Sequence, residues 1–433
     1  MAGGLLRRRA GAAAGTYASV ALGFAASIVA ARLFSRDDFG RFTLVMSALA
    51  LLQIVLDLTI EEALIKFGFR YIAAEDWGRL RRLFRQTSLV KVGGAALGTL
   101  GLLGLAAISG HVFKASHLAV PLAIAAANPL LQAPEGMSAV ALFLRGRYDV
   151  RGWFFALSMA LRLGGIAIAA PYGVSATVAV LVVEQGVTSA CIGAVGLAGF
   201  RRFPKAPHRA LGEDARAIRR FILQSSVATG IVSVRSTITP VVLGVVSSVQ
   251  QVSYFRVAQS PQQGLNAASA PIRMVLLTEQ TRDWERGQLD VVFAGIRRYT
   301  LVALAGAVVL LPPVLAFMPT IVPAIFGAKY DGAVTAARLI LVAGALQLVV
   351  GWSKSFAVTA GRPQLRIWTH GLETALLLPL AVLLGIRWGA TGAATAVLVS
   401  SVGFAASWAV LYGRIRRDPQ APSRLPRPEE VHV

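Results

Sequence analysis

Charged side chains interrupt several long apolar stretches of this chain, and two of them are arginines near the middle of such stretches, Arg162 and Arg235. An arginine at the centre of a membrane costs roughly 2.5–3.5 kcal/mol on insertion scales, so it usually faces a cavity or a partner. Guanidinium groups bind phosphate groups through paired hydrogen bonds. The two arginines therefore indicate a binding site for an anionic substrate, such as a pyrophosphate.

Carboxylates offer a second kind of chemistry in the same stretches. Glu184 and Glu373 lie well inside, and Glu135 lies nearer one end. Burial favours the protonated form of a carboxylic acid, so each of these residues could carry a coupling proton. Each could equally neutralise one of the arginines, and the sequence leaves both roles open.

Three further charges lie close to the ends of apolar stretches. Asp57, Glu61 and Lys354 are placed where a gate on the cytoplasmic side would be. The five histidines show no ligand spacing, and the only cysteine is Cys191. We therefore expect no metal site, no cofactor and no disulfide framework.

The composition indicates that these residues belong to a membrane protein. The chain is 55% hydrophobic and only 15% charged, whereas a soluble domain carries about 25% charged residues. A spanning helix needs roughly 20 apolar residues. Twelve stretches qualify, at 11–34, 41–65, 88–109, 117–143, 152–171, 174–200, 219–247, 250–278, 297–325, 331–359, 364–386 and 388–413. The sequence thus predicts an all-α polytopic protein with about twelve transmembrane helices.

The excess of basic residues, a net charge of +22, follows the same pattern. Arginines gather in every second connection, as in "RLRRLFR" at 79–85 and "RRFPK" at 201–205, while "PYG" at 171–173 and "SSVQQVS" at 247–253 have none. By the positive-inside rule, both termini are cytoplasmic. Because this distribution accounts for the charge, we expect no nucleic-acid partner.

The second half of the chain repeats features of the first. "GRYDVRGW" at 146–153 and "GRPQLRIW" at 361–368 share glycine, two arginines and tryptophan, and Asp76-Trp77 is echoed by Asp283-Trp284. Glycine permits a tight turn, and arginine and tryptophan suit the membrane interface. Six helices in each half predict two parallel lobes around a central cavity. The domains are a basic N-terminus at 1–10, lobes at 11–200 and 219–413, a basic linker at 201–218 and a disordered tail at 414–433.

The segment "AAEDWGRLRRLFRQ" at 73–86 has leucines and a phenylalanine on one face and arginines on another. This pattern predicts an amphipathic helix that lies on the inner leaflet.

Three motifs resemble the polysaccharide and O-antigen flippases of the multidrug/oligosaccharidyl-lipid/polysaccharide exporter superfamily. They are the "VSYFRVAQ" segment at 252–259, the "IFGAKYDGAV" segment at 325–334, and a first turn made by Ala31, Arg32, Leu33, Asp38, Phe39, Gly40 and Phe42. The resemblance covers residues 10–415. The chain departs from it at Ser253, where glycine is usual, and at Arg235-Ser236, where many relatives carry an aspartate.

The resemblance implies a flippase in the bacterial inner membrane. Its substrate would be a polyprenyl-pyrophosphate-linked oligosaccharide for cell-surface polysaccharide, moved by alternating access, and its partners would be membrane lipids and polysaccharide polymerase machinery. Alternatives are a cation-coupled drug antiporter of the same superfamily, a flippase for lipid-linked peptidoglycan precursors, and a scaffold for a glycan machine. A membrane-embedded polymerase is disfavoured because the outer connections are short, so we expect no enzyme.

Overall fold

The structure is a computed structural model that describes residues 2–56, 60–113, 115–269, 276, 279–280, 283–284, 286–360, 362 and 364–417. The chain divides into two compact units. The first unit is Met1–Arg256 with Ala324–Tyr330, and the second is Val257–Pro323 with Asp331–Val433. Each unit is a bundle of helices.

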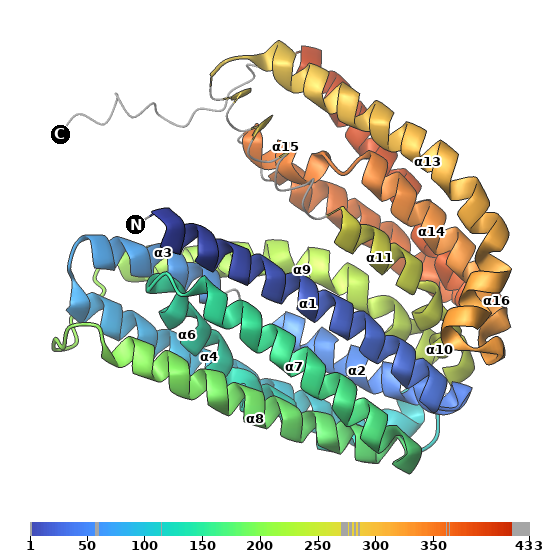
Figure 1. Cartoon of the computed structure of the whole chain (residues 1–433), viewed down its shortest axis with the longest axis horizontal. Helices are drawn as coiled ribbons and strands as arrows, with labels where there is room; N and C mark the ends of the chain where they lie inside the picture. The colour runs from blue at the N-terminus through green and yellow to red at the C-terminus, as the bar shows by residue number, and fades with distance from the viewer. Residues whose placement is uncertain are drawn as a thin grey trace. The chain divides into compact units, whose positions relative to one another are not determined.

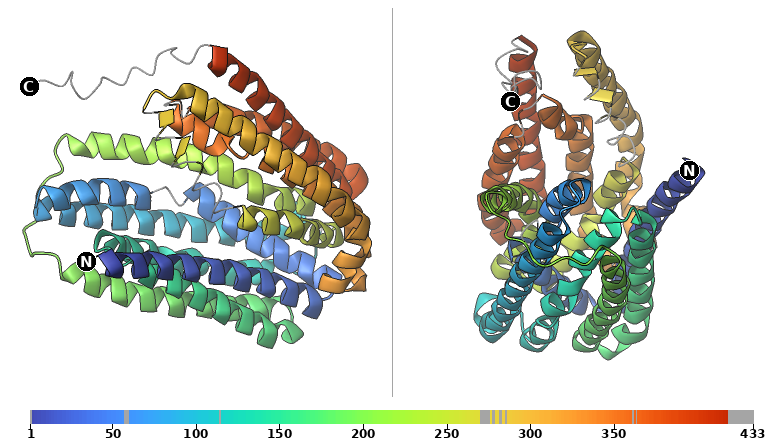
Figure 2. Two further views of the ribbon diagram at one scale, coloured as in Figure 1. Left: turned by 45° about the horizontal axis from the view of Figure 1, so that its top comes forward. Right: turned by 90° about the vertical axis from the view of Figure 1, so that its left-hand side faces the viewer.

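In the first unit, the helices from blue to green in Figures 1 and 2 run lengthwise beside one another. They are α1 (Ala2–Leu33), α2 (Arg36–Leu56), α3 (Ile60–Ala73), α4 (Trp77–Val112), α5 (Ala119–Ala125), α6 (Asn128–Leu144), α7 (Tyr148–Ala169), η1 (Ala170–Tyr172), α8 (Val174–Arg201), α9 (Asp214–Val246) and α10 (Val249–Ala258).

The second unit contains two long helices, α13 and α16, together with shorter ones. They are α11 (Ser260–Ala268), α13 (Leu289–Phe326), η2 (Ala328–Ala333), α14 (Val334–Val349), α15 (Ser353–Thr359) and α16 (Gln364–Arg417). The end of α13 and the start of η2 belong to the first unit, and the last two residues of α10 belong to the second.

Every predicted spanning stretch contains helix, and the chain is an all-helical polytopic membrane protein of about twelve helices. Seven helices of the described part are individually long and apolar enough to cross a membrane. Two reasons why the number is lower than twelve are that α16 holds two predicted stretches and that the stretch at 117–143 is divided. One division lies between α5 and α6, just before Pro129 in the first turn of α6. Proline is well placed there, because it has no amide hydrogen to satisfy.

The most extensive helix contact in the first unit joins α1 and α7, which lie side by side in Figure 1. The two helices run parallel, since Gly11 lies against Asp149 and Gly23 against Met159. Between these points the backbones nearly touch. A Cβ atom on Gly15 would lie 2.4 Å from the carbonyl carbon of Gly152. Glycine at both positions therefore sets the separation of these helices.

The basic connections of the first unit meet at one end of its bundle, as the charge pattern predicts. Arg81 donates hydrogen bonds of 3.2 Å to the carbonyl oxygens of Phe203 and Pro204 in the linker after α8. Arg70 forms an ion pair of 3.2 Å with Asp214, at the start of α9. These contacts tie the α3–α4 turn to the linker.

The predicted amphipathic surface helix at 73–86 is wrong. From Trp77 onward this segment is the first part of α4, which continues unbroken to Val112. Its apolar residues Leu80, Leu83 and Phe84 are buried in a core with residues of α3, α6 and α9. The apolar face that suggested a membrane surface is therefore covered by neighbouring helices.

Tyr71, at the end of α3, belongs to the same end of the bundle. Its hydroxyl donates a hydrogen bond of 3.0 Å to Asp214. Burial, with this hydrogen bond to Asp214 as a smaller cause, raises the pKa of Tyr71 to about 12.

The repeat is visible in the backbone of the turns. The N–H of Arg147 bonds to the carbonyl of Leu142, and the N–H of Arg362 bonds to the carbonyl of Ala357, both at 2.9 Å. In the first turn Gly146 has φ = 69°, so the helix ends in the usual glycine-dependent way. The "GR…R.W" motif is thus a helix-ending turn. Trp153 and Trp368 are both exposed, as expected for residues at a membrane interface.

The two Asp-Trp pairs do not occupy equivalent positions. Asp76 caps α4 by accepting a 3.0 Å hydrogen bond from the Arg79 N–H. Glu75 and Gly287 both have positive φ, and each lies two residues before the first residue of its helix. The residue that corresponds to Asp76 is therefore Gln288, just before α13. Asp283 therefore lies five residues too early. Both tryptophans nevertheless make aromatic contacts: Trp77 stacks on Phe203, and Trp284 meets Phe356 edge to face.

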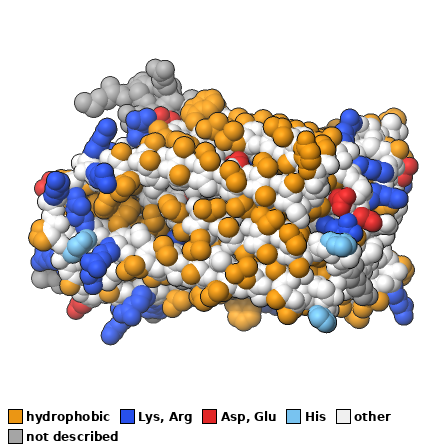
Figure 3. All heavy atoms as spheres, turned by 90° about the horizontal axis from the view of Figure 1, so that it is seen from below, with side chains coloured by type: hydrophobic (Ala, Val, Ile, Leu, Met, Phe, Trp, Pro, Cys, Tyr) orange, Lys and Arg blue, Asp and Glu red, His pale blue; other side chains and the backbone are white. Residues whose placement is uncertain are grey.

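The surface separates charged and apolar regions. Figure 3 shows one face on which hydrophobic side chains form a broad band, with Lys and Arg side chains at both of its ends. Large exposed side chains such as Leu89, Val309 and Leu310 are between 65% and 68% exposed. An apolar surface of this extent is suited to contact with lipid.

The compact units are defined by contacts and the predicted lobes by the repeat, and their limits differ. Helix α9 was predicted to open the second lobe, but it belongs to the first unit, where Gly244 lies against Leu44 of α2. The lobes at 11–200 and 219–413 remain a prediction.

We expect Gly15→Ala to destabilise the protein by about 1–3 kcal/mol, because a methyl group would force α1 away from α7. The measurement is thermal unfolding of the purified protein in detergent, followed by size exclusion. Gly164→Ala in α7 is the matched control, since nothing lies within 4 Å of its Cβ position. Equal stability of the two variants would contradict the role of this contact.

A pH-dependent difference is expected between wild type and Tyr71→Phe. The folded pKa of Tyr71 is raised above its usual value of 10. Its stabilising contribution is therefore complete below pH 10 and is lost as the pH rises towards 12. We expect wild type to melt a few degrees above the variant at pH ~8, and this difference to shrink above pH ~10. Tyr17→Phe, at an exposed position, should show no difference at either pH.

Candidate functional site

A polar cavity of about 140 Å³ lies inside the first unit. Its walls come from α2, α3, α4, α6 and α7. The cavity is lined by Leu52, Gln53, Glu61, Lys91, Gly94, Ala95, Gly98, Pro129, Gln132, Ala133, Glu135, Gly136, Arg151 and Phe155.

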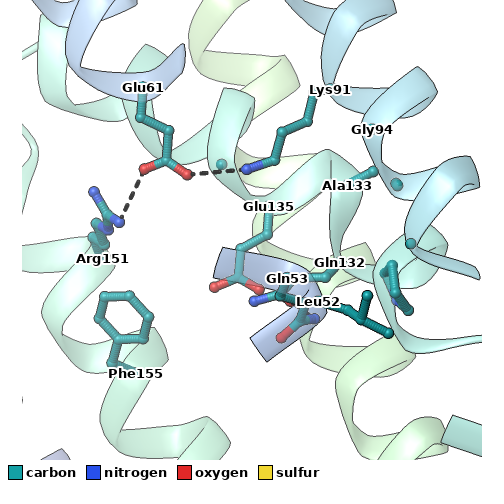
Figure 4. A pocket seen from close by; sticks show the side chains of 14 residues that line it. Leu52, Gln53, Glu61, Lys91, Gly94, Gln132, Ala133, Glu135, Arg151 and Phe155 are labelled. Atoms are coloured by element: carbon teal, nitrogen blue, oxygen red, sulfur yellow. Dashed lines mark hydrogen bonds and ion pairs between the residues drawn. The ribbon is translucent and has the colours of Figure 1, made fainter. Parts of the chain in front are cut away.

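Glu61 is the central charge of this cavity. Figure 4 shows its carboxylate between two cations, Arg151 of α7 at 3.3 Å and Lys91 of α4 at 3.6 Å. The three side chains are between 11% and 28% exposed, so the ion pairs are largely shielded from solvent. Gly136 of α6 makes room for the carboxylate, because a Cβ atom there would lie 2.2 Å from Glu61 Oε1.

Glu135 lies in the same cavity and is held by hydrogen bonds. Gln185 of α8 donates to its carboxylate at 2.9 Å, and the Ser189 hydroxyl donates at 3.3 Å. In the same cavity, Gln53 of α2 donates to Gln132 of α6 at 2.7 Å. Two carboxylates, two cations and several amides thus surround a space that α2, α3, α4, α6 and α7 enclose.

The size and chemistry of the cavity limit what it can bind. Pockets for small molecules measure about 300–1,000 Å³, so this one is too small for a lipid-linked sugar. It has room for several water molecules, which need polar partners of the kind found here. The arrangement can therefore bind a small hydrated cation or take up a proton, but it cannot hold the expected substrate.

Arg162 and Glu184 are close enough to interact electrostatically in the first unit. Arg162 is half-buried in α7, and Glu184 of α8 also accepts a 2.8 Å hydrogen bond from Ser158. Of the two roles that the sequence left open for Glu184, this closeness is the one needed to neutralise an arginine. A second cation, Arg256 of α10, lies within electrostatic range of Arg162. Two guanidinium groups thus lie near each other, and Glu184 is close to one of them, Arg162.

In the second unit, Glu373 is almost completely buried, with 1% of its surface exposed. Its carboxylate lies 3.2 Å from His370 Nδ1 and accepts a 3.3 Å hydrogen bond from Gln347 of α14. Gln347 also donates to Ser401, further along α16, at 2.8 Å. Glu373 is thus held by partners from α14 and from its own helix.

The remaining predicted residues are Arg235, Asp57 and Lys354. Arg235 lies in α9, but its side chain is outside the described residues, as is all of Asp57. Lys354 lies in α15, where it is half-buried.

Sequence reasoning missed several members of these sites. Lys91, His370 and Gln347 were not singled out, and Arg151 was counted only as a charge in a connection. One signal was available, because Lys91 interrupts an apolar stretch near its beginning, as Glu135 does near the end of another. The glutamines carried no signal, since an uncharged amide in an apolar stretch has no distinctive pattern.

A second polar cluster joins the C-terminal ends of α1 and α13 within the first unit. The Arg32 guanidinium donates to the carbonyl oxygens of Ala324 and Ile325, the latter at 2.7 Å. Lys329 donates in return to the carbonyl oxygens of Arg32 and Phe34. Each cation therefore caps the end of the other helix, where the helix dipole is negative. Burial lowers the pKa of Lys329.

Tyr330 completes this cluster. Its hydroxyl donates a 3.0 Å hydrogen bond to the carbonyl oxygen of Ala31, and Phe39 packs against its ring. Two of the motifs that carry the family resemblance, near residues 31–42 and 325–334, are thus in direct contact.

No protein-family model matches the chain, and no curated protein matches its sequence. Solved structures do match its fold. The lipid II flippase MurJ in an inward closed conformation has a TM-score of 0.70 and 12% identity, covering 93% of this chain and 87% of MurJ. The chain has the fold of a membrane transporter.

Drug transporters share this fold. An inward-facing multidrug resistance MATE family transporter of the MOP superfamily has a TM-score of 0.61 and 16% identity, over 92% of this chain and 94% of that one. A mutant of the Vibrio cholerae MATE transporter VcmN has a TM-score of 0.60 and 13% identity, over 96% and 97%. At these identities the likeness establishes the fold alone.

We expect Glu61→Gln to lower the melting temperature by several degrees, because Lys91 and Arg151 would lose the anion between them. The double variant Glu61→Gln/Arg151→Gln should be more stable than the sum of the single effects implies. A double-mutant cycle measured by thermal unfolding should give a coupling of about 0.5–3 kcal/mol. Additive single effects would show that this ion pair does not hold the cavity together.

Proposed function

We propose that this chain belongs to the MOP superfamily and moves a polyprenyl-pyrophosphate-linked oligosaccharide from the inner to the outer leaflet by alternating access. The membrane would be the bacterial inner membrane, with both termini in the cytoplasm. The observation that carries the proposal is the fold likeness to a lipid flippase over 93% of the chain. The motifs at 31–42, 252–259 and 325–334 favour the polysaccharide and O-antigen branch.

In this proposal the pyrophosphate is bound by arginines, with Arg162 and Arg235 as the principal candidates. The closeness of Arg256 to Arg162 supports an anion site, because two guanidinium groups near each other attract a multiply charged anion more strongly than one. Glu184 would hold Arg162 in place until the substrate arrives, so the carboxylate and the pyrophosphate would compete for the guanidinium group.

Transport would be coupled to a proton or cation that binds to carboxylates too enclosed to touch a lipid-linked sugar. Glu61 and Glu135 in the polar cavity, and Glu373 beside His370, are candidates for binding the coupling proton or cation. Asp57, Glu61 and Lys354 remain candidates for the cytoplasmic gate. Polymerase machinery that extends the delivered oligosaccharide would act as a partner on the outer side.

A second candidate is a cation-coupled drug antiporter. The fold likeness to MATE transporters and the two carboxylates of the polar cavity favour it. The two functions differ in what Arg162 does, because a cationic drug would be repelled by the arginines that attract a pyrophosphate. A membrane-embedded polymerase gains no support, since the solved structures named above are transporters.

The test uses a strain that lacks this gene, with lipid-linked oligosaccharides quantified by mass spectrometry. We expect a completed lipid-linked unit to accumulate and wild type to clear it. Arg162→Ala should clear it at least about tenfold more slowly, since a charge-assisted hydrogen bond contributes about 1.5–3 kcal/mol. The control is Arg387→Ala, which removes an exposed arginine and should clear the lipid normally.

Membrane levels of each variant are compared by immunoblot, so that loss of function is separated from loss of protein. If no lipid-linked unit accumulates and the strain instead becomes sensitive to cationic drugs, the antiporter is favoured. If Arg162→Ala and Arg387→Ala clear the unit equally well, Arg162 does not bind the pyrophosphate.

A further inference from the structure

A second cavity, of about 370 Å³, lies at the basic end of the first unit between α4, α6 and α8. It is separate from the polar cavity, with which it shares no lining residue. Among its walls are Leu197 of α8, which is 48% exposed, and Arg85 and His208, which are also exposed. We call it the basic groove, because it opens to the surroundings of the protein.

One part of the basic groove is cationic. Arg81 is fixed there by its hydrogen bonds to the carbonyl oxygens of Phe203 and Pro204, and its guanidinium lies 5.5 Å from the centre of the Phe200 ring. Arg85 follows one helical turn later on α4, and His208 faces the groove from the linker. Among the described residues that line the groove there is no carboxylate. A negatively charged group therefore has cations here and no competing acid.

The other part of the basic groove is apolar. Met137 and Ala141 of α6, with Leu197 of α8, form its floor. The floor is shaped by a close contact of α6 and α8, since a Cβ atom on Gly196 would lie 2.3 Å from the Ser138 Cβ. Beyond the groove along α4, Leu89 is 65% exposed, so the apolar floor continues into the lipid-facing surface.

We propose that the basic groove binds an anionic phospholipid, with its phosphate at Arg81 and Arg85 and one acyl chain along the apolar floor. The order of the residues supports this occupant. Cationic side chains come first along α4 and exposed apolar ones follow, which is the order of headgroup and acyl chain in a leaflet. Basic pockets between spanning helices on the cytoplasmic side are known to accept acidic lipid headgroups. A soluble anion has no apolar part that could contact the floor of the groove.

The bound lipid would contact three helices that carry residues of the polar cavity or their hydrogen-bond partners. Lys91 lies on α4 less than two turns after Arg85, and Glu135 lies on α6 beside Met137. A phospholipid held between α4, α6 and α8 would therefore fix the helices that carry these residues.

The test is native mass spectrometry of the full chain released from detergent with added phosphatidylglycerol or phosphatidylcholine of the same acyl chains. We expect wild type to retain phosphatidylglycerol in several-fold preference. Arg85→Ala should lose most of that preference. Arg82→Ala is the matched control, because it removes the same charge three residues away but does not line the groove, and it should keep the preference.

A second variant tests the apolar half. Ser88→Trp would fill the groove without changing its charge, and it should also reduce retention of phosphatidylglycerol. Equal retention of both lipids by wild type would overturn the proposal, as would equal losses in Arg82→Ala and Arg85→Ala. Effective competition by soluble glycerol phosphate would show that the groove binds a phosphate rather than a lipid.

Discussion

Hydrocarbon provides no hydrogen-bond partner, so each backbone amide in the apolar part of this chain must be satisfied within the protein. Long helices meet this constraint, and the points where helices stop must meet it as well. The turn at Gly146 does so by directing the N–H groups of Gly146 and Arg147 back onto the carbonyls of α6. The same backbone hydrogen bond recurs at Arg362, so the two halves of the chain end a helix with the same turn.

Charged side chains inside the bundle also need partners, and an unpaired charge there costs more free energy than an unpaired amide. Glu61 is acceptable inside the bundle because Lys91 and Arg151 surround it, and Glu373 because His370 and Gln347 contact it. Glu61 needs side chains from two other helices, α4 and α7, whereas Glu373 needs Gln347 of α14 and His370 of its own helix. The proposed coupling role follows from this dependence, because protonating a carboxylate weakens its hold on cations carried by other helices.

The sequence was sufficient to predict the helical membrane fold and the apolar stretches, because length and hydropathy suffice to recognise a spanning helix. It predicted the turn at 145–147 correctly, since glycine followed by arginine has a clear physical role. It misplaced the 73–86 segment because an amphipathic face can cover either lipid or another helix, and the pattern is identical in both cases. Partners such as Lys91 for Glu61 were not predictable, because they depend on how α3, α4 and α7 pack.

The reciprocal capping of α1 and α13 couples two helix ends that are far apart in sequence. Arg32 closes the end of α13 and Lys329 closes the end of α1, so neither contact can be released without exposing carbonyl groups on both helices. The two capping interactions therefore form and break together, without a stable state in which only one of them is made. Any motion that separates these helix ends should therefore occur in a single abrupt step.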